Sequence, residues 1–120
     1  MNNNKHDIFD SERILHILKE IETNPKVTQR YLSEKFAISL GKVNYLINAL
    51  IGKGIIKVKN FKNSKNKLAY MYLFTPYGIK TKLQLTRKFL AWKLDEYEKL
   101  RMEIENYKKE VSSNTSEKKG

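Results

Sequence analysis

Residues 40–52 carry side chains that can read the edges of nucleic-acid bases. One face, spaced at i, i+3, i+4 and i+7, is polar and has no carboxylate: Gly41, Asn44, Tyr45 and Asn48. The opposite face has the same spacing and is apolar: Val43, Leu46, Ile47 and Leu50. An asparagine amide can pair bidentately with adenine, while a lysine such as Lys42 can bind guanine or a phosphate. The pattern predicts an amphipathic helix whose outer face can form hydrogen bonds with bases.

Two more helices are predicted before this one. The first is expected from about Asp7 to Glu22, with Asp10 or Ser11 as its cap and an apolar stripe of Ile14, Ile17, Leu18 and Ile21. A short second helix follows Thr28, and Ser39 is the predicted cap of the third. Two helices joined by a tight turn predict a helix-turn-helix. The alternative is a third helix whose outer face is merely solvated. The residues expected to contact DNA from the third helix are Ser39, Gly41, Lys42, Asn44, Tyr45 and Asn48.

A basic hairpin is predicted directly after the third helix. Residues 55–59 alternate apolar and lysine side chains, residues 60–67 form a turn-rich basic loop, and residues 68–74 return as an apolar and aromatic strand. A hairpin in this position is a wing, and its tip typically lies on the phosphate backbone. The residues expected to bind phosphates, from the second helix and the wing, are Lys35, Lys59, Lys62, Asn63, Ser64, Lys65, Asn66 and Lys67.

A long helix is predicted from Pro76 to Val111, capped by Thr75. Alternating steps of four and three residues connect Ile79 to Val111, which is the seam of a heptad repeat. Because so small a winged domain could not cover this surface, we expect the helix to pair with the same helix of a second chain. Parallel and antiparallel pairing are both open. The seam residues expected in the dimer interface are Leu83, Leu90, Tyr97, Leu100, Ile104 and Tyr107.

The predicted fold is mainly α with a small β-hairpin wing, an α+β arrangement of winged helix-turn-helix and long C-terminal helix. The expected parts are a flexible N-terminus at 1–6, a DNA-binding domain at 7–75, a dimerisation helix at 76–111 and a disordered tail at 112–120. No apolar run approaches the roughly 20 residues that span a bilayer, and no secretory signal begins the chain. We therefore expect a cytoplasmic protein that does not bind membranes.

The charge is strongly segregated along the chain. The net charge is +11, but residues 35–94 contain no Asp or Glu and carry +13, which leaves −2 for the rest. This segregation produces a positive electrostatic field, which favours a polyanionic partner. The chain has no cysteine, and no paired carboxylates, metal-ligand cluster or phosphate-cradling glycine loop is recognisable. We therefore expect no enzyme activity, no metal and no cofactor.

Three segments resemble the winged helix of MarR-type transcriptional regulators: Gln29–Ser33, Ile38–Tyr45 and Lys53–Ile56. The decapeptide Val58–Lys67, with Phe74–Gly78 after it, resembles a small bacterial subgroup, the exopolysaccharide-associated MarR-family regulators. The resemblance implies DNA binding as a regulator of transcription, with a link to polysaccharide or capsule loci. Larger MarR proteins dimerise through helices at both ends of the chain, and many sense phenolic ligands. The N-terminal extension is too short here for that arrangement, so a small-molecule effector is left open.

The leading interpretation is a dimeric, sequence-specific binder of double-stranded DNA. A protein-interaction module is one alternative, because winged helices also act as scaffolds. A binder of RNA or single-stranded nucleic acid is another, with Tyr45, Phe61, Tyr70 or Tyr72 as stacking platforms. The tyrosines and phenylalanine of strands usually pack in the core, which weighs against the last alternative.

Overall fold

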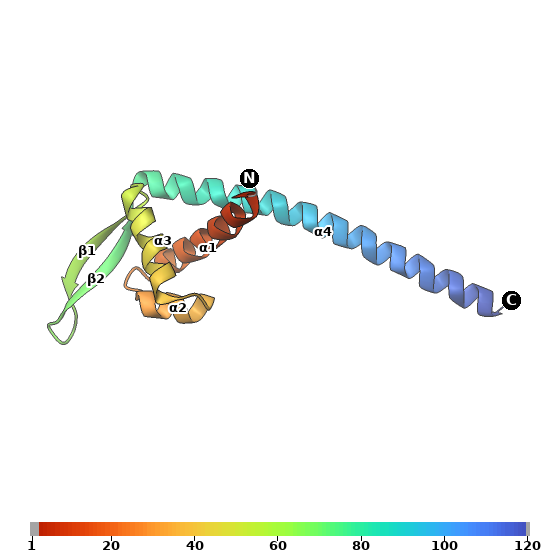
Figure 1. The fold of residues 1–120 in the computed structure, drawn as a ribbon, viewed down its shortest axis with the longest axis horizontal. Helices are drawn as coiled ribbons and strands as arrows, with labels where there is room; N and C mark the ends of the chain where they lie inside the picture. Colours follow the sequence, from red (N-terminus) through yellow and green to blue (C-terminus); the bar gives the residue numbers. More distant parts are fainter. Residues whose placement is uncertain (1–2, 120) are drawn as a thin grey trace. The chain divides into compact units, whose positions relative to one another are not determined.

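The computed structural model describes the backbone of residues 3–119 and the side chains of residues 10–114. Six elements follow along the chain: α1 (Asn3–Thr23), α2 (Gln29–Phe36), α3 (Leu40–Gly52), β1 (Ile56–Lys62), β2 (Leu68–Phe74) and α4 (Pro76–Lys119) (Figure 1). The predicted mainly helical fold with a hairpin after the third helix is confirmed. The chain divides into two compact units, Met1–Thr86 and Arg87–Gly120. The division lies within α4 rather than at its start, where the sequence places it.

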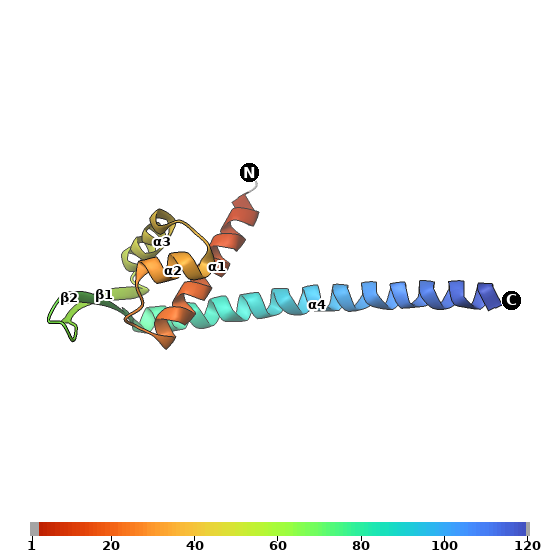
Figure 2. The same ribbon diagram turned by 90° about the horizontal axis from the view of Figure 1, so that it is seen from below.

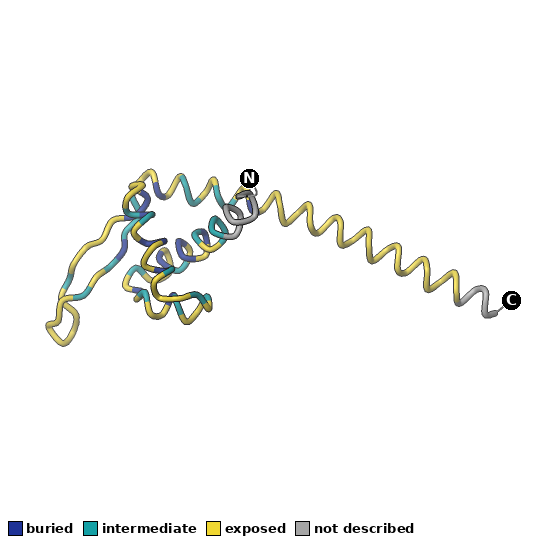
Figure 3. Tube along the Cα trace, viewed as in Figure 1, coloured by how far each residue is buried: buried dark blue, intermediate teal, exposed yellow. Residues whose placement is uncertain are grey.

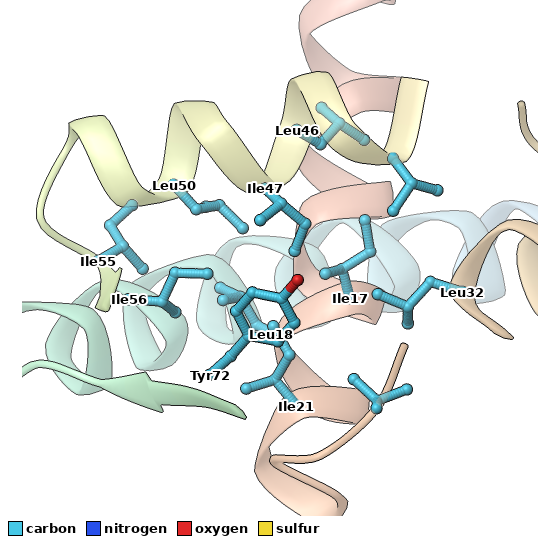
Figure 4. Close-up of a cluster of buried hydrophobic side chains, with 12 residues drawn as sticks. Ile17, Leu18, Ile21, Leu32, Leu46, Ile47, Leu50, Ile55, Ile56 and Tyr72 are labelled. Atoms are coloured by element: carbon cyan, nitrogen blue, oxygen red, sulfur yellow. The ribbon is translucent and has the colours of Figure 1, made fainter. Parts of the chain in front are cut away.

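The core of the first unit brings α1, α2, α3 and the hairpin together (Figure 4). The apolar face predicted for α3 is buried along its whole length, and Ile17, Leu18 and Ile21 of α1 are fully buried with it. Leu32 of α2 and Tyr72 of β2 close the cluster. Burying one such aliphatic side chain stabilises a fold by about 1.5–3 kcal/mol, so this packing holds the outer face of α3 toward solvent.

The turn between α2 and α3 is tight, and each of the two helices is capped at its N-terminus. Thr28 Oγ1 accepts a hydrogen bond from Tyr31 N (3.0 Å), and Ser39 Oγ accepts one from Lys42 N (3.0 Å), so both predicted caps are confirmed. Helix α2 ends on Ala37, whose φ of 53° is left-handed. That conformation costs a non-glycine residue about 1 kcal/mol, and it allows only three residues to separate α2 from α3.

The hairpin pairs β1 and β2 antiparallel, from Ile56 opposite Phe74 to Lys62 opposite Leu68. β1 continues to Lys62, although residues 60–62 are predicted as loop, because they pair with β2 and so satisfy their backbone hydrogen bonds. Tyr72 N donates to Pro25 O (2.9 Å), which ties β2 to the α1–α2 loop. The tip at residues 63–67 projects beyond the helices of this unit in both views (Figures 1 and 2).

A compact joint connects β2 to α4. Thr75 Oγ1 accepts from Gly78 N (2.9 Å) as the cap of α4 and donates to the carbonyl oxygen of Gly54. Thr75 N donates to Ile55 O (3.1 Å). A Cβ on Gly78 would lie 1.9 Å from Ile55 O, so only glycine fits at this crossing of backbones. Leu85 packs against the core, which explains why the first turns of α4 belong to the first unit.

The second unit is the remainder of α4. Residues 90–114 are exposed along their whole length (Figure 3). Charged neighbours on the helix pair with one another, as Lys99 does with Asp95 (3.1 Å) and Arg101 with Glu98. The hydrogen bond from Arg101 lowers the pKa of the Glu98 carboxyl. None of the described helices combines the length and the apolar character needed to cross a membrane.

Both helical ends extend further than predicted. Residues 1–6 and 112–120 are expected to be loose, yet α1 begins at Asn3 and α4 ends at Lys119, with residues 1, 2 and 120 outside the described part. No proline or glycine lies within residues 1–6 or 112–119 to stop the helix. Consequently Asp10 and Ser11 lie inside α1 and do not cap it. The Asp10 carboxylate instead pairs with Lys42 (3.3 Å) and Arg13 (3.8 Å).

Candidate nucleic-acid interface

The outer face of α3 presents the predicted polar residues to solvent. Gly41, Asn44, Tyr45 and Asn48 are all exposed, and the Tyr45 side chain is among the most exposed aromatics, at 63%. Leu40, at the first position of the helix, is also exposed (49%) and was not among the predicted site residues. An apolar side chain here could contact a thymine methyl group, whereas the sequence pattern marks it only as the residue after a cap.

A row of hydrogen-bonded amides runs along this face. Asn48 Nδ2 donates to Asn44 Oδ1 (3.1 Å), and Asn44 Nδ2 donates to Gln29 Oε1 (3.2 Å). Gln29 Nε2 in turn donates to the hydroxyl oxygen of Tyr72 (3.3 Å). Gln29 was not predicted as a site residue. It lies in α2, fifteen residues before Asn44, and only its position after the Thr28 cap hints that its side chain is near α3.

Two lysines predicted to contact DNA, Lys42 of α3 and Lys35 of α2, have carboxylate partners from α1. Lys42 Nζ lies 3.3 Å from Asp10 and 5.2 Å from the centre of the Tyr45 ring. Lys35 forms an ion pair with Glu20, and the hydrogen bond that its ammonium donates to that carboxylate raises the pKa of Lys35. The acid-free character of residues 35–94 therefore does not extend to the surface around α3. A polyanion would have to share these lysines with Asp10 and Glu20.

The wing tip is shaped by one side chain. Asn63 Oδ1 accepts from Lys65 N (2.9 Å) and Lys67 N (3.1 Å), while Asn63 N donates to Lys67 O (2.9 Å). Asn66 has a left-handed φ of 59°, a conformation that asparagine tolerates well. Asn63 and Asn66 thus build the turn. Among the predicted site residues of the hairpin, those that stand exposed with a charged or hydroxyl group available are Lys59, Lys62, Ser64, Lys65 and Lys67.

Shallow grooves separate the hairpin from the helices of the first unit. One, of about 180 Å³, lies between α3 and the hairpin and is lined by residues that include Asn48, Val58 and Tyr70. A second, of about 380 Å³, is lined by residues that include Phe61 and Lys26, whose ammonium lies 4.8 Å from the centre of the Phe61 ring. Tyr72 is buried (7% exposed), so it cannot serve as a stacking platform.

The arrangement therefore joins most of the predicted site into one surface. The α3 face and the wing belong to the same unit, with the amide row connecting α3 to β2. Among the residues with described side chains, no group of three or more His, Cys, Asp or Glu is placed to hold a metal ion. What the surface can do chemically is donate and accept hydrogen bonds and attract negative charge.

Comparison with known proteins supports the architecture. Residues 10–57 match the model of a winged helix-turn-helix DNA-binding family. The chain has a winged helix-turn-helix fold. The matched residues run from α1 through the second residue of β1, so they include the whole α2–α3 face. A search of curated protein sequences finds no match.

Solved structures of transcriptional regulators share this fold at low sequence identity. MarR from Staphylococcus aureus, in complex with salicylate and kanamycin, is 21% identical over 72% of this chain and 56% of its own, with a TM-score of 0.53. A MepR mutant from a multidrug-resistant S. aureus clinical isolate is 18% identical over 98% of this chain and 86% of its own, with a TM-score of 0.57. The regulator BldR from Sulfolobus solfataricus is 21% identical over 84% of this chain and 73% of its own, with a TM-score of 0.53.

Proposed function

We propose that this protein is a transcriptional regulator of the MarR type that binds double-stranded DNA sequence-specifically as a homodimer. One observation supports this above the others: an exposed row of amides on α3 lies in the same compact unit as a lysine-rich hairpin. Amides recognise bases, whereas lysines bind phosphates without regard to sequence. A binder that needs both specificity and affinity requires this combination.

In this proposal α3 enters the major groove. Gly41, Asn44, Tyr45 and Asn48 face the bases, with Gly41 allowing close backbone approach. Ser39 caps α3 through its oxygen lone pair, which leaves its hydroxyl proton free to reach a phosphate. Lys42 serves as a base or phosphate contact. The residues that bind phosphates are Lys35, Lys59, Lys62, Ser64, Lys65 and Lys67, while Asn63 and Asn66 shape the turn that presents the wing residues.

The proposal of a dimer rests on the exposed apolar seam of α4. Leu90, Tyr97, Leu100 and Tyr107 are each more than half exposed, and Leu83 and Ile104 nearly so. An apolar surface of this size on a free helix is costly in water, and pairing with a second copy removes it. Two copies would present two α3 faces related by two-fold symmetry, as a DNA inverted repeat requires.

The finer assignments follow the resemblance in the wing. We propose that the target genes are polysaccharide or capsule loci, because the decapeptide Val58–Lys67 resembles the exopolysaccharide-associated subgroup. We also propose a cytoplasmic location, as DNA regulation in bacteria requires. The protein would act by binding and not by catalysis.

Selection of bound duplexes tests the proposal. The full-length protein is incubated with a randomised duplex pool at near-physiological salt, and the bound fraction is sequenced. We expect an enriched inverted repeat with half-site centres about 10 base pairs apart or a multiple of that. Affinity for the selected site should fall with salt at a log–log slope of about −0.9 per phosphate neutralised. Binding without enrichment would contradict sequence-specific regulation, and failure to bind any duplex would favour a protein partner.

The substitution Asn44→Ala tests base recognition directly. If Asn44 reads a base, this substitution lowers affinity for the selected site and leaves random duplexes unaffected. Sedimentation equilibrium of the same protein measures the dimer independently of DNA.

A further inference from the structure

We propose that the hydroxyl of Tyr72 and the amide of Gln29 are positioning groups that orient Asn44 for adenine. The inference rests on the proposed function, because it names the base that the α3 face would select. It assigns a role in DNA specificity to a buried residue of the wing and to the first residue of α2.

The hydrogen-bond row leaves Asn44 with the groups that adenine requires. Its Nδ2 gives one proton to Gln29 Oε1 (3.2 Å) and keeps the other, and its Oδ1 accepts from Asn48 Nδ2 (3.1 Å) with one lone pair remaining. Adenine presents an N7 acceptor and an N6 donor in the major groove. Guanine presents two acceptors there, so one amide cannot pair with both. The row is therefore complementary to adenine and mismatched to guanine.

Tyr72 anchors one end of the row. Its phenol ring is buried, with 7% of the residue exposed, and its backbone N–H is bonded to Pro25 O (2.9 Å). The hydroxyl at the end of this buried ring accepts from Gln29 Nε2 (3.3 Å). In the structure Gln29 directs its nitrogen to Tyr72 and its oxygen to Asn44, and Asn44 directs its nitrogen to Gln29. Without the Tyr72 hydroxyl, Gln29 would lose the partner that holds its side chain beside Asn44, and a bidentate pair of Asn44 with adenine would lose preorganisation.

The test compares two quantities for each variant: its discrimination between A·T and G·C pairs in the half-site, and its overall affinity for DNA. Fluorescence anisotropy measures the wild type on its selected duplex and on duplexes with each A·T pair of the half-site changed to G·C. The same set is measured for Tyr72→Phe, which removes only the hydroxyl, and for Asn44→Ala. Tyr77→Phe is the matched control, because it removes an exposed tyrosine hydroxyl from the start of α4, outside the row. Thermal melting of each variant shows whether the fold is retained.

The expected result is a loss confined to one position. Asn44→Ala should lower discrimination at one A·T pair by about 5- to 150-fold, the range for one bidentate contact. Tyr72→Phe should lower discrimination at the same pair by about 2- to 10-fold, the value of one neutral hydrogen bond. Affinity for random duplexes should not change. The double variant should match Asn44→Ala alone, because Tyr72 acts through Asn44.

Three results would overturn the inference. These are that Tyr72→Phe keeps full discrimination at every pair, that it lowers affinity for all duplexes equally, or that its effect adds independently to that of Asn44→Ala. Should Tyr72→Phe fail to fold, Gln29→Met replaces it and is expected to give the same loss at the same pair. A wild type that selects no sequence would refute the proposed function as well, which separates that failure from a specific site that Tyr72 does not influence.

Discussion

Replacing Gly78 with alanine should destabilise the first unit strongly. The new Cβ would lie 1.9 Å from Ile55 O, whereas a carbon and a carbonyl oxygen normally approach no closer than about 3.3 Å. The two backbones must separate by roughly 1.4 Å, because neither atom belongs to a side chain that can rotate away. That movement also strains the Thr75 cap on Gly78 N and the bond from Thr75 N to Ile55 O.

The magnitude follows from these losses. Overpacking costs about 1–3 kcal/mol, a lost helix cap about 1 kcal/mol, and a broken backbone hydrogen bond about 1 kcal/mol. The intrinsic preference of a helix for alanine over glycine returns at most about 1 kcal/mol. We therefore expect Gly78→Ala to lower the free energy of unfolding by about 3 kcal/mol, a large part of the roughly 5–15 kcal/mol of a typical domain.

Urea denaturation followed by circular dichroism at one fixed protein concentration measures this change. Gly52→Ala is the matched control, because Gly52 ends α3 and has no atom within 4 Å of its virtual Cβ. The control should be neutral or slightly more stable. A Gly78→Ala variant as stable as the wild type would refute the argument that the α4 start and the α3–β1 turn lie in fixed contact.

Further substitutions address the wing, the α1 carboxylates and the seam. Asn63→Ala removes two hydrogen bonds from the wing tip, so hydrogen exchange of the Lys65 and Lys67 amides should accelerate about tenfold. Unchanged exchange would show that the loop is held otherwise. Glu20→Gln releases Lys35 from its ion pair and should raise affinity for random duplexes about 2- to 5-fold at low salt in an anisotropy titration; equal affinity would mean that the pair does not compete with phosphate. Ile104→Asp places a charge in the seam and should raise the dimer dissociation constant at least about tenfold in sedimentation equilibrium, and an unchanged constant would place the interface elsewhere.

Local chemistry in the sequence was sufficient for most of the fold. Caps at Thr28 and Ser39 and the apolar faces of α1 and α3 act between residues a few positions apart, so their spacing alone predicts the elements. The ends of the helices were harder to predict. Whether a helix continues into polar residues depends on small propensities rather than on a distinct stop signal, and α1 and α4 both extend beyond the predicted bounds.

The candidate site was predictable in composition but not in its connections. The polar face of α3 follows from helical spacing, which requires no knowledge of the other elements. The partners of that face come from elsewhere: Gln29 from α2, Tyr72 from β2 and Asp10 from α1. Such pairs depend on how the helices pack against one another, and a single sequence contains no periodicity that reports it.

The loop held by Asn63 changes the thermodynamics of any encounter at the wing. A five-residue loop that becomes ordered only on binding would lose about 1–2 kcal/mol of conformational entropy per residue at that moment. Here Asn63 Oδ1 already accepts hydrogen bonds from two backbone amides, and Asn66 already has the left-handed backbone conformation that the turn requires. The loop therefore loses its conformational entropy when the protein folds, before any partner binds. A nucleic-acid partner would meet a wing tip of set backbone geometry, and its binding entropy would reflect released counterions and lysine side-chain freedom instead of loop closure.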